Sequence, residues 1–272
     1  MSASFYFDNN LTIDKKKVRQ SFSSAAETYD GLATLQRKVG LDLLAKVAWQ
    51  DSDTIILDIG CGTGFLTQEL MLKSSAQQLI GLDIAMPMVQ ASRAKLEHFN
   101  KVRYLCADAE HLPLANNSVD SIYSNLALQW CQNLTSVFKN FKQVLKQDGR
   151  IYFSTFGPTT LQELKNSWAE VDGFTHVNDF YSGDELLSYL QKSGFSDIKI
   201  ETKSYQSNYQ TVLELMRELK GIGAHNVLEG RYRKTTSRTR MQKMVESYEK
   251  YRVNGLLPAT YEVVFASAKA SL

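Results

Sequence analysis

Apolar residues follow two different spacings along this chain, and these spacings predict where helices and strands lie. Between residues 31 and 49, apolar side chains recur every three or four positions, which places them in a stripe on one face of a helix. Residues 54–59 form a short apolar run that is rich in β-branched side chains and is followed by glycines. Such a run is typical of a central strand that is buried on both faces of a parallel sheet.

Segments with strand-like and helix-like patterns then alternate through the first half of the chain. After the first strand we expect a helix, a strand, a helix, two strands, a helix and a strand, at residues 65–73, 79–82, 87–99, 102–106, 118–124, 133–146 and 150–155. Gly149 follows the last of these helices, where glycine commonly caps a helix C-terminus. The alternation predicts an α/β fold with a doubly wound, mostly parallel sheet, because right-handed crossovers put helices on both faces of such a sheet.

In the second half of the chain, strand-like and helix-like segments no longer alternate regularly. Ser182 is expected to cap a helix that has two acidic residues in its first turn and stops at Gly194. Strands are expected at 198–202 and 261–268. Residues 204–257 have a mostly helical pattern and are basic, so we expect a helical insertion over the active site between these two strands.

The composition places the chain among ordinary folded domains. Hydrophobic residues make up 43% and charged residues 22% of its 272 residues, values near the averages for globular proteins. The N-terminal segment has no apolar core ahead of a cleavage site, and no run of 18 apolar residues occurs, so we expect a cytoplasmic protein with no membrane span. The net charge of +2 is too small to indicate nucleic-acid binding. The three cysteines lack the paired spacing of a zinc site or a disulfide framework, which predicts reduced thiols and no bound metal.

The strongest chemical signal is the segment Asp-Ile-Gly-Cys-Gly-Thr-Gly at 58–64, between an expected strand and an expected helix. Glycines allow the backbone to turn tightly and to approach a ligand closely. The helix that follows offers unpaired N–H groups and the positive end of its dipole. A tight turn without any ligand is the alternative explanation, since a lone glycine-rich match is a weak signal.

Acidic residues at a regular spacing add to this signal. Asp83 lies 25 residues after Asp58, at the end of an expected strand, where nucleotide-binding α/β folds place an acceptor for ribose hydroxyls. Asp108 follows the next strand, a further 25 residues along the chain. Three acids at successive strand ends lie at the edge of the sheet where open α/β folds bind ligands. Capping roles at the protein surface are the competing explanation.

Three motifs, LDIGCGTG, the acid that ends the second strand and ADAEHLPL, together resemble those of class I S-adenosylmethionine-dependent methyltransferases over about 54–156. The resemblance implies a Rossmann-like fold and S-adenosylmethionine as cofactor. Asp58 and the glycine loop would surround its methionine part, Asp83 its ribose, and Asp108 with Ala109 its adenine. The full set of expected cofactor-binding residues is Asp58, Gly60, Cys61, Gly62, Gly64, Asp83, Ile84, Asp108, Ala109 and Asn125.

Four further segments, SFSSAAETYD, SNLALQW, LMRELKGIGAHN and LPATYEVVFASA, extend a narrower resemblance over nearly the whole chain. They resemble the BioC family, the malonyl-acyl-carrier-protein O-methyltransferases of biotin synthesis. The resemblance implies methyl transfer to the free carboxylate of a malonyl thioester on acyl carrier protein. In other class I methyltransferases a Tyr-Asp pair near the N-terminus closes over the cofactor, so Tyr29 is a candidate lid residue, with an ordinary core tyrosine as the alternative.

These patterns predict one methyltransferase domain over residues 1–272. Within it we expect an N-terminal helical lid and first helix at 1–50, an S-adenosylmethionine-binding core at 51–156, and a helical substrate lid at 204–257.

The acceptor site is harder to locate than the cofactor site. A malonyl carboxylate is ionised at neutral pH, because ordinary carboxyl pKa values lie near about 4, so no catalytic base is needed. A cation should recognise it, and Arg217, Lys220 and His225 fall within one helical stretch, although solvated helix charges are the commoner explanation of such residues. Gln129 and Trp130 follow the fourth strand, which predicts that they line the acceptor site.

The segment 231–243 contains no acid and carries six basic residues, which leave a net negative charge on the rest of the chain: Arg231, Arg233, Lys234, Arg238, Arg240 and Lys243. A solvated helix face and nucleic acid are the usual interpretations of such a run. Carrier proteins are acidic in the family that the resemblance implies, so we expect this segment to dock one and expect no nucleic-acid or membrane partner.

Three other functions remain open at this stage. Another small-molecule methyltransferase of the same fold, acting on a quinone precursor or an organic acid, is the main alternative. A binding protein that retains the cofactor site without catalysis is a second. A dehydrogenase is a third, but it would require G-x-G-x-x-G, whereas this chain has G-x-G-x-G after an acid.

Overall fold

The structure, a computed structural model, describes residues 13–224 and 236–271. Within these residues the strands form one seven-stranded sheet, in the order β3-β2-β1-β4-β5-β7-β6. The strands are β1 (Ile55–Ile59), β2 (Gln78–Asp83), β3 (Val102–Cys106), β4 (Val119–Asn125), β5 (Leu145–Phe156), β6 (Phe195–Tyr209) and β7 (Leu257–Ala270). β7 runs antiparallel to both of its neighbours, whereas the other neighbouring strands pair in parallel. The mostly parallel α/β fold expected from the sequence is confirmed.

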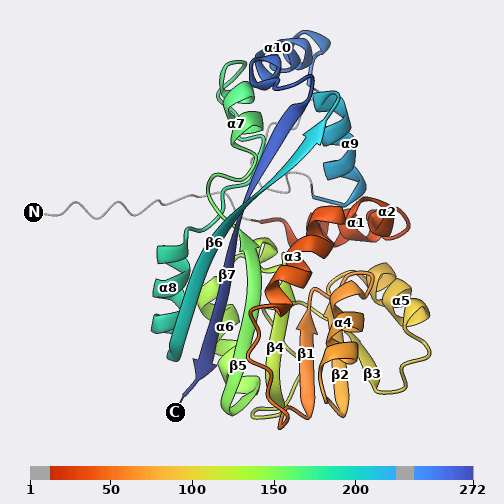
Figure 1. Ribbon diagram of the computed structural model, residues 1–272, viewed down its shortest axis with the longest axis vertical. Coiled ribbons are helices and arrows are strands. Elements are labelled where there is room, and N and C mark those ends of the chain that lie inside the picture. The colour runs from red at the N-terminus through yellow and green to blue at the C-terminus, as the bar shows by residue number, and fades with distance from the viewer. Residues whose placement is uncertain (1–12, 225–235, 272) are drawn as a thin grey trace, which may run out of the picture.

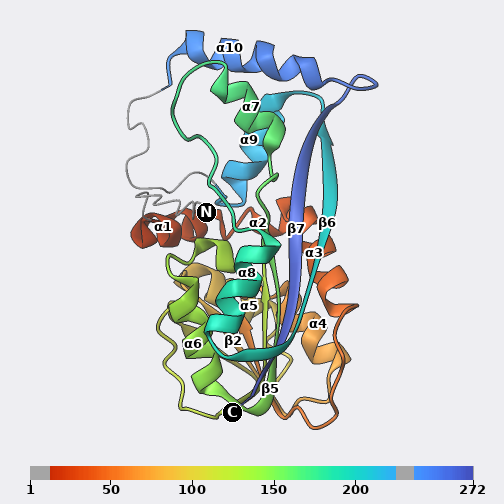
Figure 2. The same ribbon diagram turned by 90° about the vertical axis from the view of Figure 1, so that its left-hand side faces the viewer.

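Helices cover both faces of the sheet (Figure 2). A separate set of buried side chains lies on each face. α3 (Thr34–Leu44) and α4 (Phe65–Lys73) pack on one face. α6 (Leu134–Val144) and α8 (Gly183–Lys192) pack on the other, where Phe138 is fully buried. The helices present one apolar stripe each, whereas β1 is apolar almost throughout because both of its faces are covered.

β6 and β7 continue beyond the sheet as a two-stranded ribbon (Figure 1). β5 pairs with β7 only as far as Phe156 and Val263, whereas β6 stays paired with β7 up to Tyr209 and Leu257. The outer parts of β6 and β7 therefore lack a third strand and must be covered by helices.

Three helices provide that cover: α7 (Gln162–Ala169), α9 (Val212–Gly221) and α10 (Arg238–Tyr248). α7 contacts both β7 and α10, and α9 contacts β6. Four buried tyrosines lie in the core of this region, Tyr205, Tyr209, Tyr248 and Tyr261. We call residues 157–181, 204–224 and 236–262 the cap.

Two N-terminal helices, α1 (Lys15–Ala25) and α2 (Tyr29–Leu32), lie at the carboxyl end of β1, between the sheet and the cap (Figure 1). Asp14 begins α1 by accepting a hydrogen bond from the Lys17 N–H at 3.1 Å. α1 packs against α5 (Met86–Lys95). The apolar pattern did not give the bounds of α1, because its buried positions include small residues such as Ser21 and Ala25 instead of a clear apolar stripe.

Several expected element boundaries were right and others were wrong. Ser182 caps α8 in a capping box with Glu185, and Gly194 follows that helix with a φ of 80°, as expected. The helical insertion was expected to start at residue 204, but 204–209 belong to β6, whose polar side chains conceal a strand that is paired with β7. Gly149 does not cap a helix: it lies within β5, where a Cβ atom would come within 2.8 Å of the Asp120 carbonyl oxygen.

No helix in the described ranges is long and apolar enough to cross a membrane.

Candidate active site

The glycine-rich loop joins β1 to α4 at the edge where the parallel strands end. Gly60 and Gly64 have φ angles of 71° and 89°, a left-handed conformation that glycine adopts without strain. A Cβ atom on Gly60 would overlap the Ala127 side chain, and one on Gly64 would overlap Ser92. The Gly60 N–H donates to the Leu82 carbonyl oxygen of β2 at 2.7 Å. Glycine is therefore required for the loop to lie this close to its neighbours.

Asp83, at the end of β2, holds the loop from the other side. Its Oδ2 accepts a hydrogen bond from the Gly62 N–H at 3.0 Å, and its Oδ1 accepts one from the Ala85 N–H at 2.8 Å. Burial raises the pKa of Asp83 to about 6, although these backbone donors oppose the shift. A carboxylate has about four acceptor positions, so Asp83 retains acceptor capacity for hydroxyl groups of a ligand.

Asp58, at the end of β1, is 1% exposed. Its Oδ2 accepts a hydrogen bond from the Thr67 hydroxyl of α4 at 2.6 Å, and its Oδ1 has no partner among the described residues. Burial raises the pKa of Asp58 to about 7. Asp58 therefore ties the strand to the helix that follows the loop.

A cavity, which we call the loop cavity, lies between the glycine loop, the ends of β2, β3 and β4, and α1. The sequence-predicted residues that line it are Tyr29, Gly60, Gly62, Asp83, Ile84, Asp108, Ala109, Asn125 and Trp130. Three other predicted residues lie behind the loop: Asp58 and Cys61 are buried there, and Gly64 is the N-cap of α4. Asn125 is fixed by two contacts, since its Nδ2 donates to the Gln36 carbonyl oxygen and its Oδ1 accepts from the Ser154 hydroxyl.

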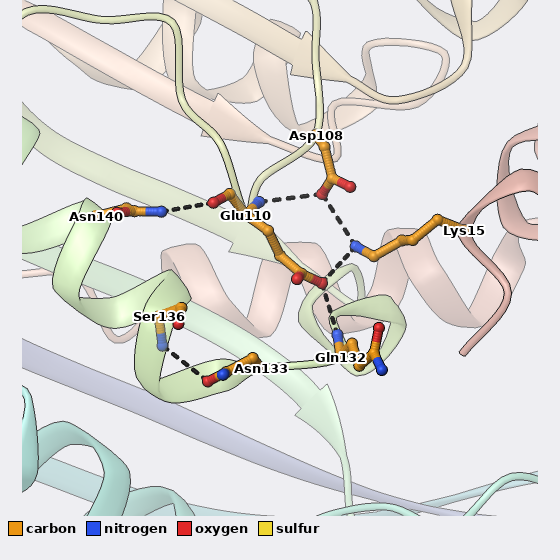
Figure 3. Close-up of polar contacts among 7 residues, drawn as sticks. All are labelled: Lys15, Asp108, Glu110, Gln132, Asn133, Ser136 and Asn140. Atoms are coloured by element: carbon orange, nitrogen blue, oxygen red, sulfur yellow. Dashed lines mark hydrogen bonds and ion pairs between the residues drawn. The ribbon is translucent and has the colours of Figure 1, made fainter. Parts of the chain in front are cut away.

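Lys15 of α1 bridges two acids beyond the end of β3 (Figure 3). Its Nζ lies 3.0 Å from Asp108 Oδ1 and 2.6 Å from Glu110 Oε1. Glu110 Oε1 also accepts a hydrogen bond from the Gln132 N–H at 2.6 Å, and the Asn140 side chain donates to the Glu110 carbonyl oxygen. These contacts hold α1 across the loop cavity at the side where Asp108 and Ala109 lie.

The Tyr-Asp pair at the start of α2 covers the glycine loop. Tyr29 lines the loop cavity, and burial raises the pKa of its hydroxyl above the ordinary value. Asp30 accepts a hydrogen bond from the Thr63 hydroxyl and pairs with Lys95 of α5. Burial alone would raise the pKa of Asp30, but these two contacts lower it. Asp30 thus anchors α2 over the loop.

A second cavity of about 420 Å³, the cap cavity, lies between the sheet edge and the cap. Its lining is mostly apolar and comes from α3, η1 (Leu128–Trp130), the end of β5, α7, α9, α10 and β7. Trp130 lines both cavities, and its ring packs edge-on against Phe22 of α1 with 5.5 Å between centroids. The two cavities therefore meet at Trp130.

The polar and charged side chains that line the cap cavity include His176, Asn178, Glu218 and Lys220. Glu218 accepts a hydrogen bond from the Tyr209 hydroxyl at 3.0 Å, and burial raises its pKa. Lys220 brings a cation to the lining, as a bound carboxylate requires.

Two residues predicted for the acceptor site, Gln129 and Arg217, line neither cavity. Gln129 lines neither cavity, because its Nε2 donates to the Leu126 carbonyl oxygen at 2.7 Å and its Oε1 accepts from Thr155. Arg217 is exposed on α9, on the side opposite to buried Leu215, and lines neither cavity. His225 lies outside the described residues.

Three of the six basic residues of segment 231–243 lie on α10: Arg238, Arg240 and Lys243. The other three, Arg231, Arg233 and Lys234, lie outside the described residues. Arg238 and Lys243 are exposed. Arg240 is engaged instead: its Nη1 lies 3.8 Å from Asp172 Oδ2, and its guanidinium lies over the Phe174 ring. Only Arg238 and Lys243 are thus fully presented to a partner from the described part of this segment.

Sequence reasoning missed several residues that line these cavities. Lys15 and Glu110 meet only in the fold, and nothing in their sequence neighbourhoods indicates the pairing. Trp168, His176 and Asn178 line the cap cavity from α7 and the segment that follows it, where the sequence pattern gave no clear element.

Comparison with known proteins identifies related chains. The family described as "Methyltransferase domain" matches residues 57–153. A malonyl-acyl-carrier-protein O-methyltransferase of Gallionella capsiferriformans (strain ES-2) is 40% identical over 267 residues, which cover 96% of this chain and 92% of that one. The biotin biosynthesis bifunctional protein BioHC of Cellvibrio japonicus (strain Ueda107) is also 40% identical, over 96% of this chain and 51% of that longer one.

Solved structures share the fold at lower identity. Phosphoethanolamine N-methyltransferase 2 of Haemonchus contortus, solved in complex with S-adenosyl-L-methionine, has a TM-score of 0.58 and 16% identity. The match covers 92% of this chain and 57% of that one. The similarity places the loop cavity within a methyltransferase fold.

Proposed function

Because the chain belongs to the malonyl-acyl-carrier-protein O-methyltransferase family, we propose that it methylates the free carboxylate of a malonyl thioester on acyl carrier protein, with S-adenosylmethionine as the methyl donor. The reaction would be a step of biotin biosynthesis. The observation that carries the proposal is the pair of cavities that meet at Trp130, one at the glycine loop and one under the cap.

The residues of the loop cavity fit S-adenosylmethionine. Asp83 retains acceptor positions for ribose hydroxyls, and Asp108 and Ala109 line the side where the adenine would lie. Gly60 and Gly62 bring the backbone close to the cavity, where a side chain would fill space. When bound, the cofactor supplies a methyl group on a positively charged sulfur.

In the proposed reaction, the cap cavity binds and orients the methyl acceptor. A malonyl carboxylate is ionised at neutral pH, so the chain needs no base to activate it. Lys220, an exposed residue of α9, offers a charge partner for the carboxylate, and the rest of the lining is mostly apolar. Charges of opposite sign disappear as the methyl group moves, so a dry lining favours the transition state over the solvated reactants. Trp130, which lines both cavities, would border both ligands and orient one toward the other.

The carrier protein would dock on α10. This helix exposes Arg238 and Lys243 and contributes Met241 to the cap cavity, so an acidic partner bound there would lie beside the acceptor site.

One assay tests the proposal directly. The protein is incubated with S-adenosylmethionine and malonyl carrier protein, and the intact carrier protein is weighed by mass spectrometry. We expect one added methyl group, and no addition to unacylated carrier protein. Methylation of a free organic acid or a quinone precursor but not of the malonyl carrier protein would overturn the proposed substrate. Cofactor binding without turnover of any acceptor would overturn the proposed catalysis.

A further inference from the structure

One polar side chain in the wall of the cap cavity is buried without a partner. Asn178 lies between α7 and α8, is 7% exposed and lines the cavity. Its Oδ1 forms no hydrogen bond within the part of the chain that the structure describes. A buried amide oxygen without a donor is destabilising, so a ligand that donates a hydrogen bond here would be favoured.

His176 lines the same cavity, and its ring is held by two contacts. Nε2 lies 2.8 Å from Asp172 Oδ1, and the ring stacks on Trp168 with 3.8 Å between centroids and 9° between planes. When Nε2 donates to Asp172, the neutral ring retains Nδ1 as its acceptor nitrogen. The fixed ring therefore adds a second acceptor near Asn178.

Acceptor atoms in this part of the wall select for a ligand segment with N–H groups. A carboxylate carries only acceptors at neutral pH, so it fits Lys220 better than it fits Asn178 and His176. Apolar side chains line the same cavity and include Leu164, Val177 and Met241. An extended segment in which amide groups alternate with methylene groups suits such a wall.

We propose that Asn178 and His176 form a subsite for the amide-containing arm through which a carrier protein presents its thioester. The Asn178 carboxamide carries both an acceptor and a donor, which are the two groups that an amide of the arm requires. The inference rests on the proposed function, because it assumes that the acceptor is an arm-bound thioester. The subsite determines which acceptors bind and takes no part in bond formation.

The test compares two malonyl thioesters, malonyl-pantetheine with two amides and malonyl-propanethiol with none. Asn178→Leu removes both polar groups at nearly constant size. We expect it to raise KM for malonyl-pantetheine about three- to tenfold, with kcat, KM for malonyl-propanethiol and affinity for S-adenosylmethionine unchanged. Asn208→Leu, at an exposed position on β6, is the matched control and should change none of these values.

His176→Phe keeps an aromatic ring on Trp168 but removes both ring nitrogens, Nδ1 and the Nε2 that contacts Asp172. It provides a second test with the same expected pattern if Asn178→Leu does not fold. An unchanged KM for malonyl-pantetheine, or an equal rise for both thioesters, would overturn the subsite. If the wild-type protein does not methylate malonyl carrier protein, the proposed function fails, and calorimetry with pantetheine then decides the inference separately. Weaker pantetheine binding by Asn178→Leu would support the subsite, and equal binding would overturn it.

Discussion

The loop cavity and the cap cavity share one residue but are built in different ways. The loop cavity is formed largely by backbone turns and acids at the ends of neighbouring parallel strands, and most of its wall lies within residues 59–131. The cap cavity is formed by side chains between residues 35 and 261, from seven different helices and strands. A cavity made by backbone geometry tolerates few substitutions but is recognisable in sequence, whereas one made by packing depends on many distant residues.

The largest expected effect lies in the cap. Trp168 is 4% exposed, stacks on His176 and lines the cap cavity, so Trp168→Ala should lower the free energy of unfolding by about 3–5 kcal/mol. Urea unfolding measures this loss. Trp49→Ala, at a side chain that is 38% exposed, should cost much less. At low temperature the folded Trp168→Ala protein should bind S-adenosylmethionine as the wild type does, and a matching loss of affinity would show that the two cavities are not independent.

A smaller loss of stability is expected at the glycine loop. Gly60→Ala places a Cβ atom against Ala127 at a φ of 71°, so it should cost about 2–4 kcal/mol and displace the loop. Thermal unfolding and cofactor titration should both detect the change. Gly31→Ala is the control, because nothing lies within 4 Å of its added Cβ atom. Equal stability of the two variants would contradict the close approach at Gly60.

Asp83→Ala tests the carboxylate of the loop cavity. Loss of a charged acceptor should weaken binding of S-adenosylmethionine by about 1.5–3 kcal/mol while the protein stays folded. Calorimetry on the folded variant measures the affinity, and an unchanged value would remove Asp83 from the ribose site.

The raised pKa of Asp83 adds a pH dependence to the same measurement. Because burial raises this pKa from 3.8 to about 6, the free protein holds the Asp83 proton more tightly than the unfolded chain does. The contribution of Asp83 to stability is therefore present below pH 3.8 and is lost as pH rises through about 6. Cofactor affinity should follow the opposite course, falling as pH drops below about 6, and Asp83→Ala should abolish that part of the pH dependence.

The smallest expected effect concerns the outer surface of the cap. Reversing Arg238 and Lys243 to Glu should raise KM for malonyl carrier protein several-fold and flatten its salt dependence, with little change for a small malonyl thioester. Arg240 is left intact because its pairing with Asp172 supports the cavity wall. Lys192→Glu with Lys199→Glu, on α8 and β6, changes the net charge equally and serves as the control. An equal rise of KM in both double variants would mean that overall charge, not docking on α10, is responsible.

The contrast between the cavities also explains what the sequence could predict. Asp58, Asp83 and the glycines are local signals, because a strand end and a tight turn are each specified by a few adjacent residues. Lys220 lines the cap cavity and Arg217 does not, although residues three apart share a helix face. Which of the two reaches the cavity depends on how α9 packs through Leu215, and the sequence pattern does not give this.

Longer-range features gave no sequence signal. Lys15 and Glu110 are brought together only by the fold, so neither residue suggests the other. Residues 204–209 form a strand without an apolar pattern, because their pairing with β7 supplies the backbone hydrogen bonds.

The position of β7 has a consequence for how the chain is made. Of the seven strands that the structure describes, β7 comes last along the chain, yet it lies between β5 and β6 in the sheet. The glycine loop and strands β1 to β5 can therefore assemble while the C-terminal segment is still in the ribosome, but β6 has no strand partner until β7 emerges. A nascent or truncated chain would expose the edges of β5 and β6 together, and such edges pair readily with other chains. The order of the strands therefore lets the part of the sheet around the loop cavity assemble before the β6–β7 ribbon of the cap.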